Sequence, residues 1–268
     1  MSDLLYEKEA GVVTITMNRP ERRNAISPEM MVRLGEAWVN FQADDDLRVA
    51  ILTGAGSEAF CVGGDLQLLI PLFTGARQPE SEWDQKLMGN LGFTMTSLLK
   101  GFELYKPVIS AVNGTATAGG CEILQATDIR IASTNARLGL AEAKRGLVPG
   151  GGSLVRLPRQ IPYCKAMEIL LLGDLIDAQE AWRIGLINEV VAPDELMPRA
   201  HEIAAKLAAN GPFALRKIKE AVLRTSGLPL GEAHDIENQL SGEVMSSADA
   251  REGPKAFVEK RTPNWKGR

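Results

Sequence analysis

The stretch KPVISAVNGTATAGGCEILQATDIRIASTNARLGLAEAKRGLVPGGG, residues 106–152, decides the fold of this chain. Residues 108–112 are apolar, short and rich in β-branched side chains, with a proline before them and Asn113-Gly114 after them, which predicts a buried strand. A run of helical character, CEILQATD, follows a pair of glycines, and residues 128–133 form the next predicted strand. Strands that alternate with helices predict an α/β fold.

The same stretch contains backbone donors and carboxylates. Gly119-Gly120 lead into the predicted helix, where the first amides lack intrahelical acceptors and lie at the positive end of the helix dipole. Glu122 lies in the first turn of that helix, and Glu142 follows the next strand. Taken alone, the first glutamate is explained by dipole compensation and the second by solvation. The pattern also allows two carboxylates to converge beside one anion hole, one charged as a base and the other neutral as an acid.

Composition limits the class of protein. The chain has 268 residues, enough for one large α/β domain or a domain with an appendage. Its 34 acidic and 30 basic residues give a net charge of −4, which excludes a broad basic surface for nucleic acid. The N-terminus MSDLLYEKEAG lacks the pattern of a signal peptide, and no apolar run is long enough to span a bilayer. We therefore expect a cytoplasmic protein with no nucleic acid or membrane partner.

The cysteines and histidines form no motif of a metal site or a nucleophile. Cys61, Cys121 and Cys164 show no CxxC spacing, which argues against both a disulfide framework and a thiolate metal site. His201 and His234 lack an HxxxH partner, and the chain contains no GxSxG elbow. We therefore expect no metal site, and carboxylates become the candidates for acid–base chemistry.

A second glycine turn lies earlier in the chain. Residues 54–59 fit the loose dinucleotide fingerprint G-x-G-x-x-A after a predicted strand, but AFCVGG follows at once, without the helix and acidic strand end that a dinucleotide site requires. Residues 59–65 instead repeat the design of the opening stretch, with an apolar run, the pair Gly63-Gly64, and a helix capped by Asp65. Each of the two glycine turns therefore offers a donor at a helix start.

The remaining chain divides into a polar excursion and a helical tail. Residues 71–86 read as a mobile loop, followed by one long amphipathic helix with its apolar face on residues 87–102. From residue 193 to the end the pattern is helical only. This change predicts an α/β body, residues 1–192, and a separate packing or oligomerisation region, residues 193–268.

Six motifs in fixed order span nearly the whole chain. They are NRPERRNAI, VAILTGAGSEAFCVGGDL, KPVISAVNGTATAGGCEI, LGLAEAKRGLVPGGGS, GDLIDAQEAWRIGLINEVV and FVEKRTPNW. Together they resemble the crotonase superfamily, the enoyl-CoA hydratases and isomerases. The resemblance implies a spiral of repeated ββα units over residues 1–192 as the catalytic core, and a helical trimerisation region over residues 193–268. It also implies a homotrimer or a dimer of trimers.

The resemblance assigns roles to four residues of the two turns. Gly64 and Gly119 match the positions whose N–H groups bind the thioester oxygen. Glu122 and Glu142 match the two hydratase glutamates; the first would assist attack of water at C3, and the second would deliver a proton to C2. This implies hydration of a trans-2-enoyl-CoA to a 3-hydroxyacyl-CoA without a metal or redox cofactor, since CoA arrives as part of the substrate.

Further residues match the binding site for CoA. Arg23 and Ala25 match the segment that runs beside the pantetheine and phosphates, and Leu66 follows the first donor. Phe257 and Lys260 resemble residues that reach the nucleotide site of a neighbouring subunit.

The sequence also departs from the common family pattern. Ala118 stands where a glycine is common, Ala141 where proline is frequent, and Gln67 where a lysine often occurs. The run EAKRGLVP is similar to the carnitinyl-CoA dehydratase branch, which makes dehydration of a specialised 3-hydroxyacyl-CoA, or another acyl-CoA lyase or isomerase activity, the alternative reaction. A non-catalytic acyl-CoA-binding or scaffold protein is the alternative of a different class.

Overall fold

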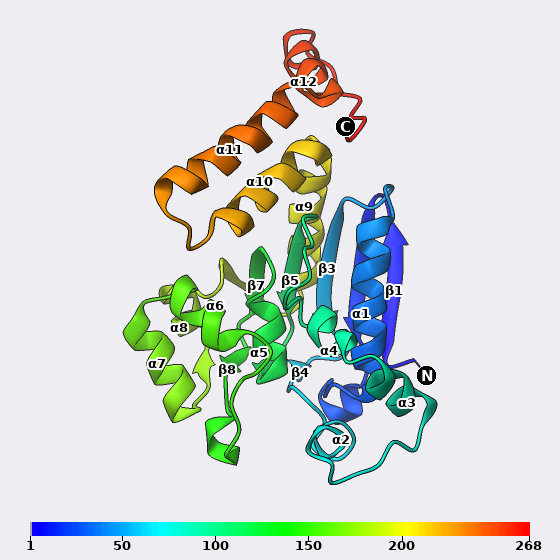
Figure 1. Cartoon of the computed structure of the whole chain (residues 1–268), viewed down its shortest axis with the longest axis vertical. Helices are drawn as coiled ribbons and strands as arrows, with labels where there is room; N and C mark the ends of the chain where they lie inside the picture. Colours follow the sequence, from blue (N-terminus) through cyan, green and yellow to red (C-terminus); the bar gives the residue numbers. More distant parts are fainter. Residues whose placement is uncertain (1) are drawn as a thin grey trace.

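The computed structural model describes residues 2–268, and its centre is a twisted six-stranded sheet (Figure 1). In spatial order the strands are β1 (Leu4–Glu9), β2 (Val12–Met17), β3 (Val49–Gly54), β5 (Val108–Val112), β7 (Ile129–Ser133) and β10 (Glu189–Val191). Among the strand pairs of this six-stranded sheet, only the β1–β2 hairpin is antiparallel. Every residue of β3 and β5 is buried, as expected for central parallel strands covered on both faces.

A smaller, four-stranded sheet is formed by the strands that follow β3, β5 and β7 in the sequence, together with one later strand. Its spatial order is β4 (Ala59–Cys61), β6 (Thr115–Thr117), β8 (Arg137–Gly139) and β9 (Ile176–Asp177). Thus β3 is followed by β4, β5 by β6, and β7 by β8, so the chain alternates between the two sheets and advances by one strand in each. This repetition confirms the predicted spiral of ββα units.

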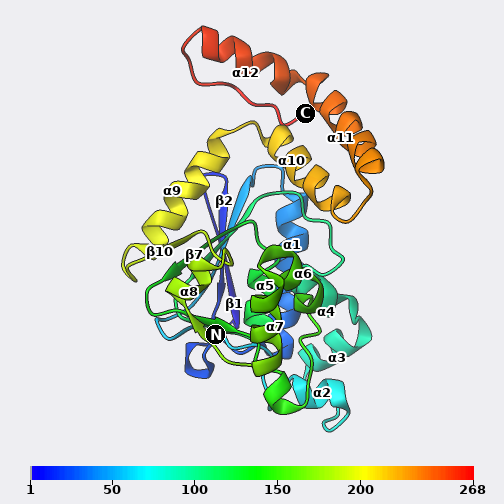
Figure 2. The same cartoon turned by 90° about the vertical axis from the view of Figure 1, so that its left-hand side faces the viewer.

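Helices cover both faces of the large sheet (Figures 1 and 2). On one face lies α1 (Pro28–Ala43), which buries Trp38 and Phe41 in the main core. It begins where the Ser27 hydroxyl accepts the Met30 N–H at 3.0 Å. On the other face α9 (Leu196–Ala209) forms a second core with β3, β5 and β7. Each face of the sheet therefore has its own apolar layer.

The predicted loop and long helix after the first glycine turn are wrong. This region instead contains three short helices, α2 (Ile70–Thr74), α3 (Glu82–Gly89) and α4 (Gly92–Ser97). A capping box between Ser81 and Asp84 starts α3 inside the expected loop. Asn90 is not helical, and its side chain accepts the Gly92 N–H at 3.0 Å, which separates α3 from α4.

The remaining helices are one short 3-10 turn before α1 and the helices that begin at or after the second glycine turn. They are η1 (Pro20–Arg22), α5 (Gly119–Leu124), η2 (Ala143–Arg145), α6 (Ser153–Gln160), α7 (Tyr163–Leu172), α8 (Ala178–Arg183), α10 (Pro212–Thr225), α11 (Leu230–Met245) and α12 (Ala248–Val258). In both views α10–α12 extend beyond the end of the large sheet. A domain boundary at residue 193 stays a prediction. Within residues 2–268, none of the helices combines the length and apolarity needed to cross a membrane.

Candidate active site

The two glycine turns meet at the edge of the small sheet. Strands β4 and β6 are parallel neighbours, so the turns that leave their carboxyl ends lie side by side. A Cβ built on Gly119 would lie 3.8 Å from the Gly64 amide nitrogen. Gly120 approaches even closer, because a Cβ there would lie 2.0 Å from the Cys61 carbonyl oxygen. Across residues 2–268, no protein acceptor pairs with the N–H of Gly64 or Gly119, so both donors are available to a ligand.

The second turn includes a strained alanine. Ala118 has φ +51° and ψ −129°, a backbone region that glycine occupies easily and other residues occupy at a cost of about 1–3 kcal/mol. A Cβ on Gly63 would lie only 2.5 Å from the Ala118 Cβ. The alanine at this family glycine position is therefore accommodated because residue 63 of the opposite turn has no side chain.

Glu122 is buried at the N-terminus of a second helix. Its side chain comes from the first turn of α5, only 4% of the residue is exposed, and Oε1 accepts the Ser153 N–H at 3.3 Å. Gly152, at φ +129°, turns the chain into α6 and aims that N–H at the carboxylate. Burial raises the pKa of Glu122, while the amides of Ser153 and Gly151 and the charge of Arg156 oppose the rise.

Glu142 is also buried but lacks comparable support. It immediately precedes η2, 9% of the residue is exposed, and its Oε2 has no hydrogen-bond partner in the described chain. Burial is the main cause that raises the pKa of Glu142 to about 7, and the neighbouring charge of Glu122 adds to the rise. Glu142 is therefore partly protonated near neutral pH, which suits a proton donor.

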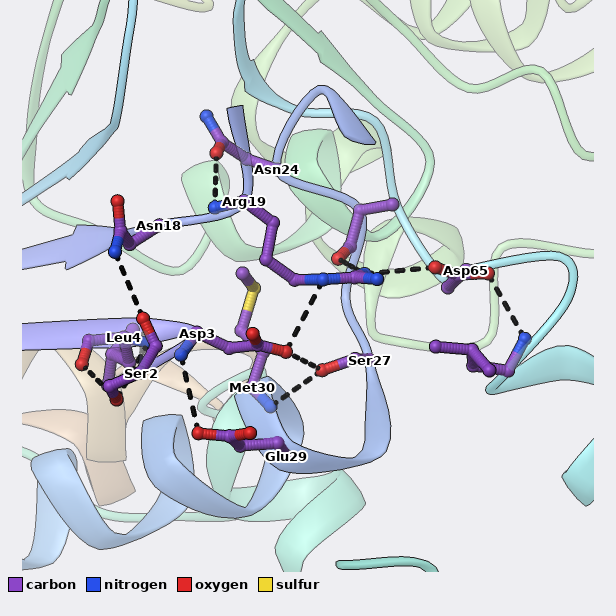
Figure 3. Close-up of polar contacts among 12 residues, drawn as sticks. Ser2, Asp3, Leu4, Asn18, Arg19, Asn24, Ser27, Glu29, Met30 and Asp65 are labelled. Atoms are coloured by element: carbon purple, nitrogen blue, oxygen red, sulfur yellow. Dashed lines mark hydrogen bonds and ion pairs between the residues drawn. The ribbon is translucent and has the colours of Figure 1, made fainter. Parts of the chain in front are cut away.

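Two charged residues hold the first turn (Figure 3): Arg19, which the sequence analysis did not identify, and Asp65, which it predicted only as a helix cap. Arg19 Nη1 donates to Asp65 Oδ2 at 2.9 Å and to the Ala25 carbonyl at 2.6 Å, and Arg19 Nε lies 3.3 Å from Asp3 Oδ2. Burial opposes ionisation of Asp65, but the Gln67 N–H, Arg19 and the Leu68 N–H outweigh it and lower its pKa. Asp65 follows Gly64 directly, so this charged network fixes the position of the first donor.

The predicted CoA-contacting residues of the first motifs lie beside that turn. Ile26 N donates to the Gly63 carbonyl at 2.8 Å, and Asp65 N donates to the Ile26 carbonyl at 2.9 Å. The segment with Arg23 and Ala25 therefore runs next to the donor. Arg23 has an exposed side chain, Leu66 is exposed after the turn, and Ala25 is buried.

The predicted C-terminal contacts lie elsewhere. Phe257 is 85% exposed near the end of α12, and Lys260 follows that helix. Figures 1 and 2 show α12 at one end of the molecule, beyond α11, and α5 well away from it in the body. A single chain does not bring Phe257 and Lys260 to the site.

The two cysteines beside the turns are not poised as nucleophiles. Cys61 and Cys121 are buried, and burial raises the pKa of each thiol to about 12. Both thiols are therefore neutral near pH 7. Glu122 and Glu142 remain the candidates for acid–base chemistry at this site.

Comparisons with known proteins agree with this arrangement. A family model described as enoyl-CoA hydratase/isomerase matches residues 7–268. The chain is 45% identical to enoyl-CoA hydratase EchA19 of Mycobacterium tuberculosis, over 99% of this chain and 97% of that protein, and 40% identical to a carnitinyl-CoA dehydratase of Proteus mirabilis over 100% of both. A crystal structure of an enoyl-CoA hydratase from Mycobacterium tuberculosis superposes with a TM-score of 0.88 at 36% identity, covering 100% of both chains. The chain therefore belongs to the enoyl-CoA hydratase/isomerase family of the crotonase superfamily.

Proposed function

We propose that this protein is an enoyl-CoA hydratase, which adds water to a trans-2-enoyl-CoA thioester and yields a 3-hydroxyacyl-CoA. The observation that carries the proposal is the pairing of two free backbone donors with two buried glutamates of different surroundings. The full-length similarity to a hydratase at 45% identity supports the same reaction.

In this proposal the Gly64 and Gly119 amides bind the thioester oxygen. Attack of water at C3 forms the C3–O bond and moves the electrons of the double bond toward C2 and the thioester oxygen, which becomes enolate-like. Donors fixed in a water-poor site stabilise that charge more than water does, and one such donor is worth roughly a hundred- to a thousandfold in rate.

The glutamates divide the proton transfers. Glu122, whose carboxylate faces the amides at the start of α6, takes a proton from the attacking water, and Glu142 gives its proton to C2. Water has then been added across the double bond, and a proton passes from Glu122 to Glu142 to restore both groups. The unpaired Oε2 of Glu142 leaves that group free to meet water or substrate. The reaction needs no metal or redox cofactor, because CoA enters with the substrate.

We further propose a homotrimer or a dimer of trimers, in which a neighbouring subunit supplies Phe257 and Lys260 to the CoA. Large apolar side chains lie exposed along the projecting helices, at Ile218, Val222, Leu230, Met245, Phe257 and Val258. Exposed apolar surface of this extent is typical of subunit contacts. A stable monomer in sedimentation experiments would contradict the assembly.

The proposed reaction is tested with crotonyl-CoA, whose double bond absorbs ultraviolet light and is lost on hydration. Glu122→Gln and Glu142→Gln should each nearly abolish turnover while CoA binding, measured by calorimetry, is retained. If both variants hydrate crotonyl-CoA at the parent rate, the two-carboxylate mechanism is wrong. If the parent binds acyl-CoA but converts no thioester of a broad panel, the chain is a binding or scaffold protein.

A second candidate reaction is dehydration of a carnitine thioester. Its support is the 40% identity to carnitinyl-CoA dehydratases over the whole chain. Turnover of carnitinyl-CoA with no turnover of straight-chain enoyl thioesters would favour this second reaction.

A further inference from the structure

Two chain segments meet behind the Glu122 carboxylate. One is the end of α4 with Leu98, and the other is the turn at Gly151. A Cβ built on Gly151 would lie 2.5 Å from Leu98 Cδ1 and 2.6 Å from Glu122 Oε2. The Gly151 backbone is therefore confined between the two side chains. A shift of this turn would move the amides that face Glu122.

Arg156 joins these segments through their carbonyl groups. Nη1 donates to the Leu98 carbonyl at 3.2 Å and to the Gly151 carbonyl at 3.4 Å, and Nη2 donates to the Leu99 carbonyl. The side chain comes from the first turn of α6 and points back over its start, where a Cβ on Gly152 would lie 2.7 Å from Nη1. One guanidinium thus spans three carbonyls, which its planar fork allows and a lysine does not.

The contact also holds an unfavourable backbone. Leu99 has φ +50°, a left-handed conformation that costs energy for a residue with a branched side chain. Its carbonyl is the one that receives Nη2 of Arg156. The arginine therefore stabilises a conformation that the Leu98–Leu99 segment would otherwise leave.

The joined segments are anchored to the core. Trp38 of α1 donates its indole N–H to the Ser97 carbonyl at 3.1 Å, and Lys100 Nζ donates to the Gly150 carbonyl at 2.8 Å. Arg156 is half-buried, and no ion pair among residues 2–268 includes it. Its charge is not neutralised by an ion pair and acts on Glu122, while its hydrogen bonds are all to backbone.

We propose that Arg156 is a positioning residue for Glu122, which clamps the Leu98–Leu99 and Gly151–Ser153 segments so that the α6 amides face the carboxylate. The inference rests on the proposed hydratase function, because it gives Glu122 the role of base. Arg156 itself touches no reacting atom in this scheme.

Three variants test the clamp. Arg156→Met removes both charge and fork, Arg156→Lys keeps the charge, and Arg159→Met is the matched control, because Arg159 is exposed on the same helix and bonds only to the Val155 carbonyl. For Arg156→Met we expect kcat for crotonyl-CoA to fall by up to about a hundredfold with KM little changed, as for a small misplacement of a catalytic group. Arg159→Met should match the parent.

The pH profile separates positioning from general loss of structure. The charged groups that act on the Glu122 carboxylate and its neighbour are Glu142, Arg156 and Arg145. Loss of the Arg156 charge raises the pKa of the base, so the rising limb of the kcat profile should move to higher pH in Arg156→Met. In Arg156→Lys the limb should stay in place while kcat falls, because the charge remains and the fork is lost.

Hydrogen exchange supplies a readout that does not depend on turnover. In Arg156→Met and Arg156→Lys, the amides of residues 98–100 and 151–153 should exchange faster than in the parent, with the rest of the sheet unchanged. A parent enzyme that hydrates nothing would overturn the proposed function, and the exchange result would still decide the clamp. If Arg156→Lys, or Arg156→Met where it folds, keeps the parent kcat, pH profile and exchange, the clamp is wrong.

Discussion

Glu122 and Glu142 are the same residue type in one site, and both are nearly excluded from solvent. The Glu122 side chain comes from α5 and reaches the start of α6, where amides and the charge of Arg156 act on its carboxylate. Glu142 has an oxygen without any partner in the described chain, and its pKa rises to about 7. Burial raises the pKa of both groups. The surrounding donors, more than burial itself, therefore distinguish the proposed base from the proposed acid.

Among changes to the surroundings of these two glutamates, Gly151→Ala is expected to lower kcat the most. The new Cβ would lie 2.6 Å from Glu122 Oε2 and 2.5 Å from Leu98 Cδ1, so it must displace the base or its amides. We expect kcat for crotonyl-CoA to fall about a hundredfold, the scale of a displacement of about 1 Å.

Gly150→Ala is the matched control for that change, since a Cβ at Gly150 meets no atom within 4 Å. It should keep the parent kcat. Equal losses in both variants would show that the turn tolerates no side chain for reasons unrelated to Glu122.

The pH dependence of kcat/KM tests the two protonation states directly. Glu142 must be protonated to donate, so activity should fall as pH rises through about 7, the value to which burial raises its pKa. Glu122 must be ionised to accept, so activity should also fall as pH drops through its own raised pKa. A bell-shaped profile for the free enzyme is the expected result. A rate that stays constant between pH 6 and 8 would remove Glu142 from the role of acid.

The smallest effect is expected from Ser153→Ala. The Ser153 amide that faces Glu122 is kept. The hydroxyl is lost, which accepts the Gln125 amide at 2.9 Å and is the smallest of the named influences that oppose the rise in the Glu122 pKa. Loss of one neutral hydrogen bond costs about 1 kcal/mol in stability, so melting temperature should decline slightly while kcat changes by a few-fold at most. A loss as large as that of Gly151→Ala would mean that the hydroxyl, not the amide, supports the base.

Sequence reasoning predicted the glycine turns and carboxylates because their signals are local. Gly64 and Gly119 each follow a short strand, and neighbouring parallel strands bring such ends together. The supporting arginines gave no local signal, since Arg19 and Asp65 are 46 positions apart and Arg156 reaches a carbonyl 58 positions away. Their pairing depends on how successive turns of the spiral stack, which spacing within one motif does not encode.

The helices after the first turn were missed for a different reason. Asp84 completes a capping box with Ser81 and also pairs with Arg77 at 2.7 Å, so a polar stretch that reads as loop is fixed by its own charges. The contact proposed for Phe257 could not be tested within one chain, because the CoA that it would reach is bound to another subunit. Local composition therefore underestimates the order of a polar segment whose charged side chains pair with one another. It also cannot place a residue whose proposed contact is on another subunit.

The closeness of the glycine turns also restricts how such an enzyme can evolve. Every amino acid that one base change can introduce at a glycine codon carries a Cβ, and at Gly120 that atom would meet the Cys61 carbonyl at 2.0 Å. The proposed anion hole is therefore protected from gradual change by the geometry of its backbone. The carboxylates have no such protection, so descendants of this scaffold can acquire new reactions by exchanging side chains around an inherited oxyanion hole.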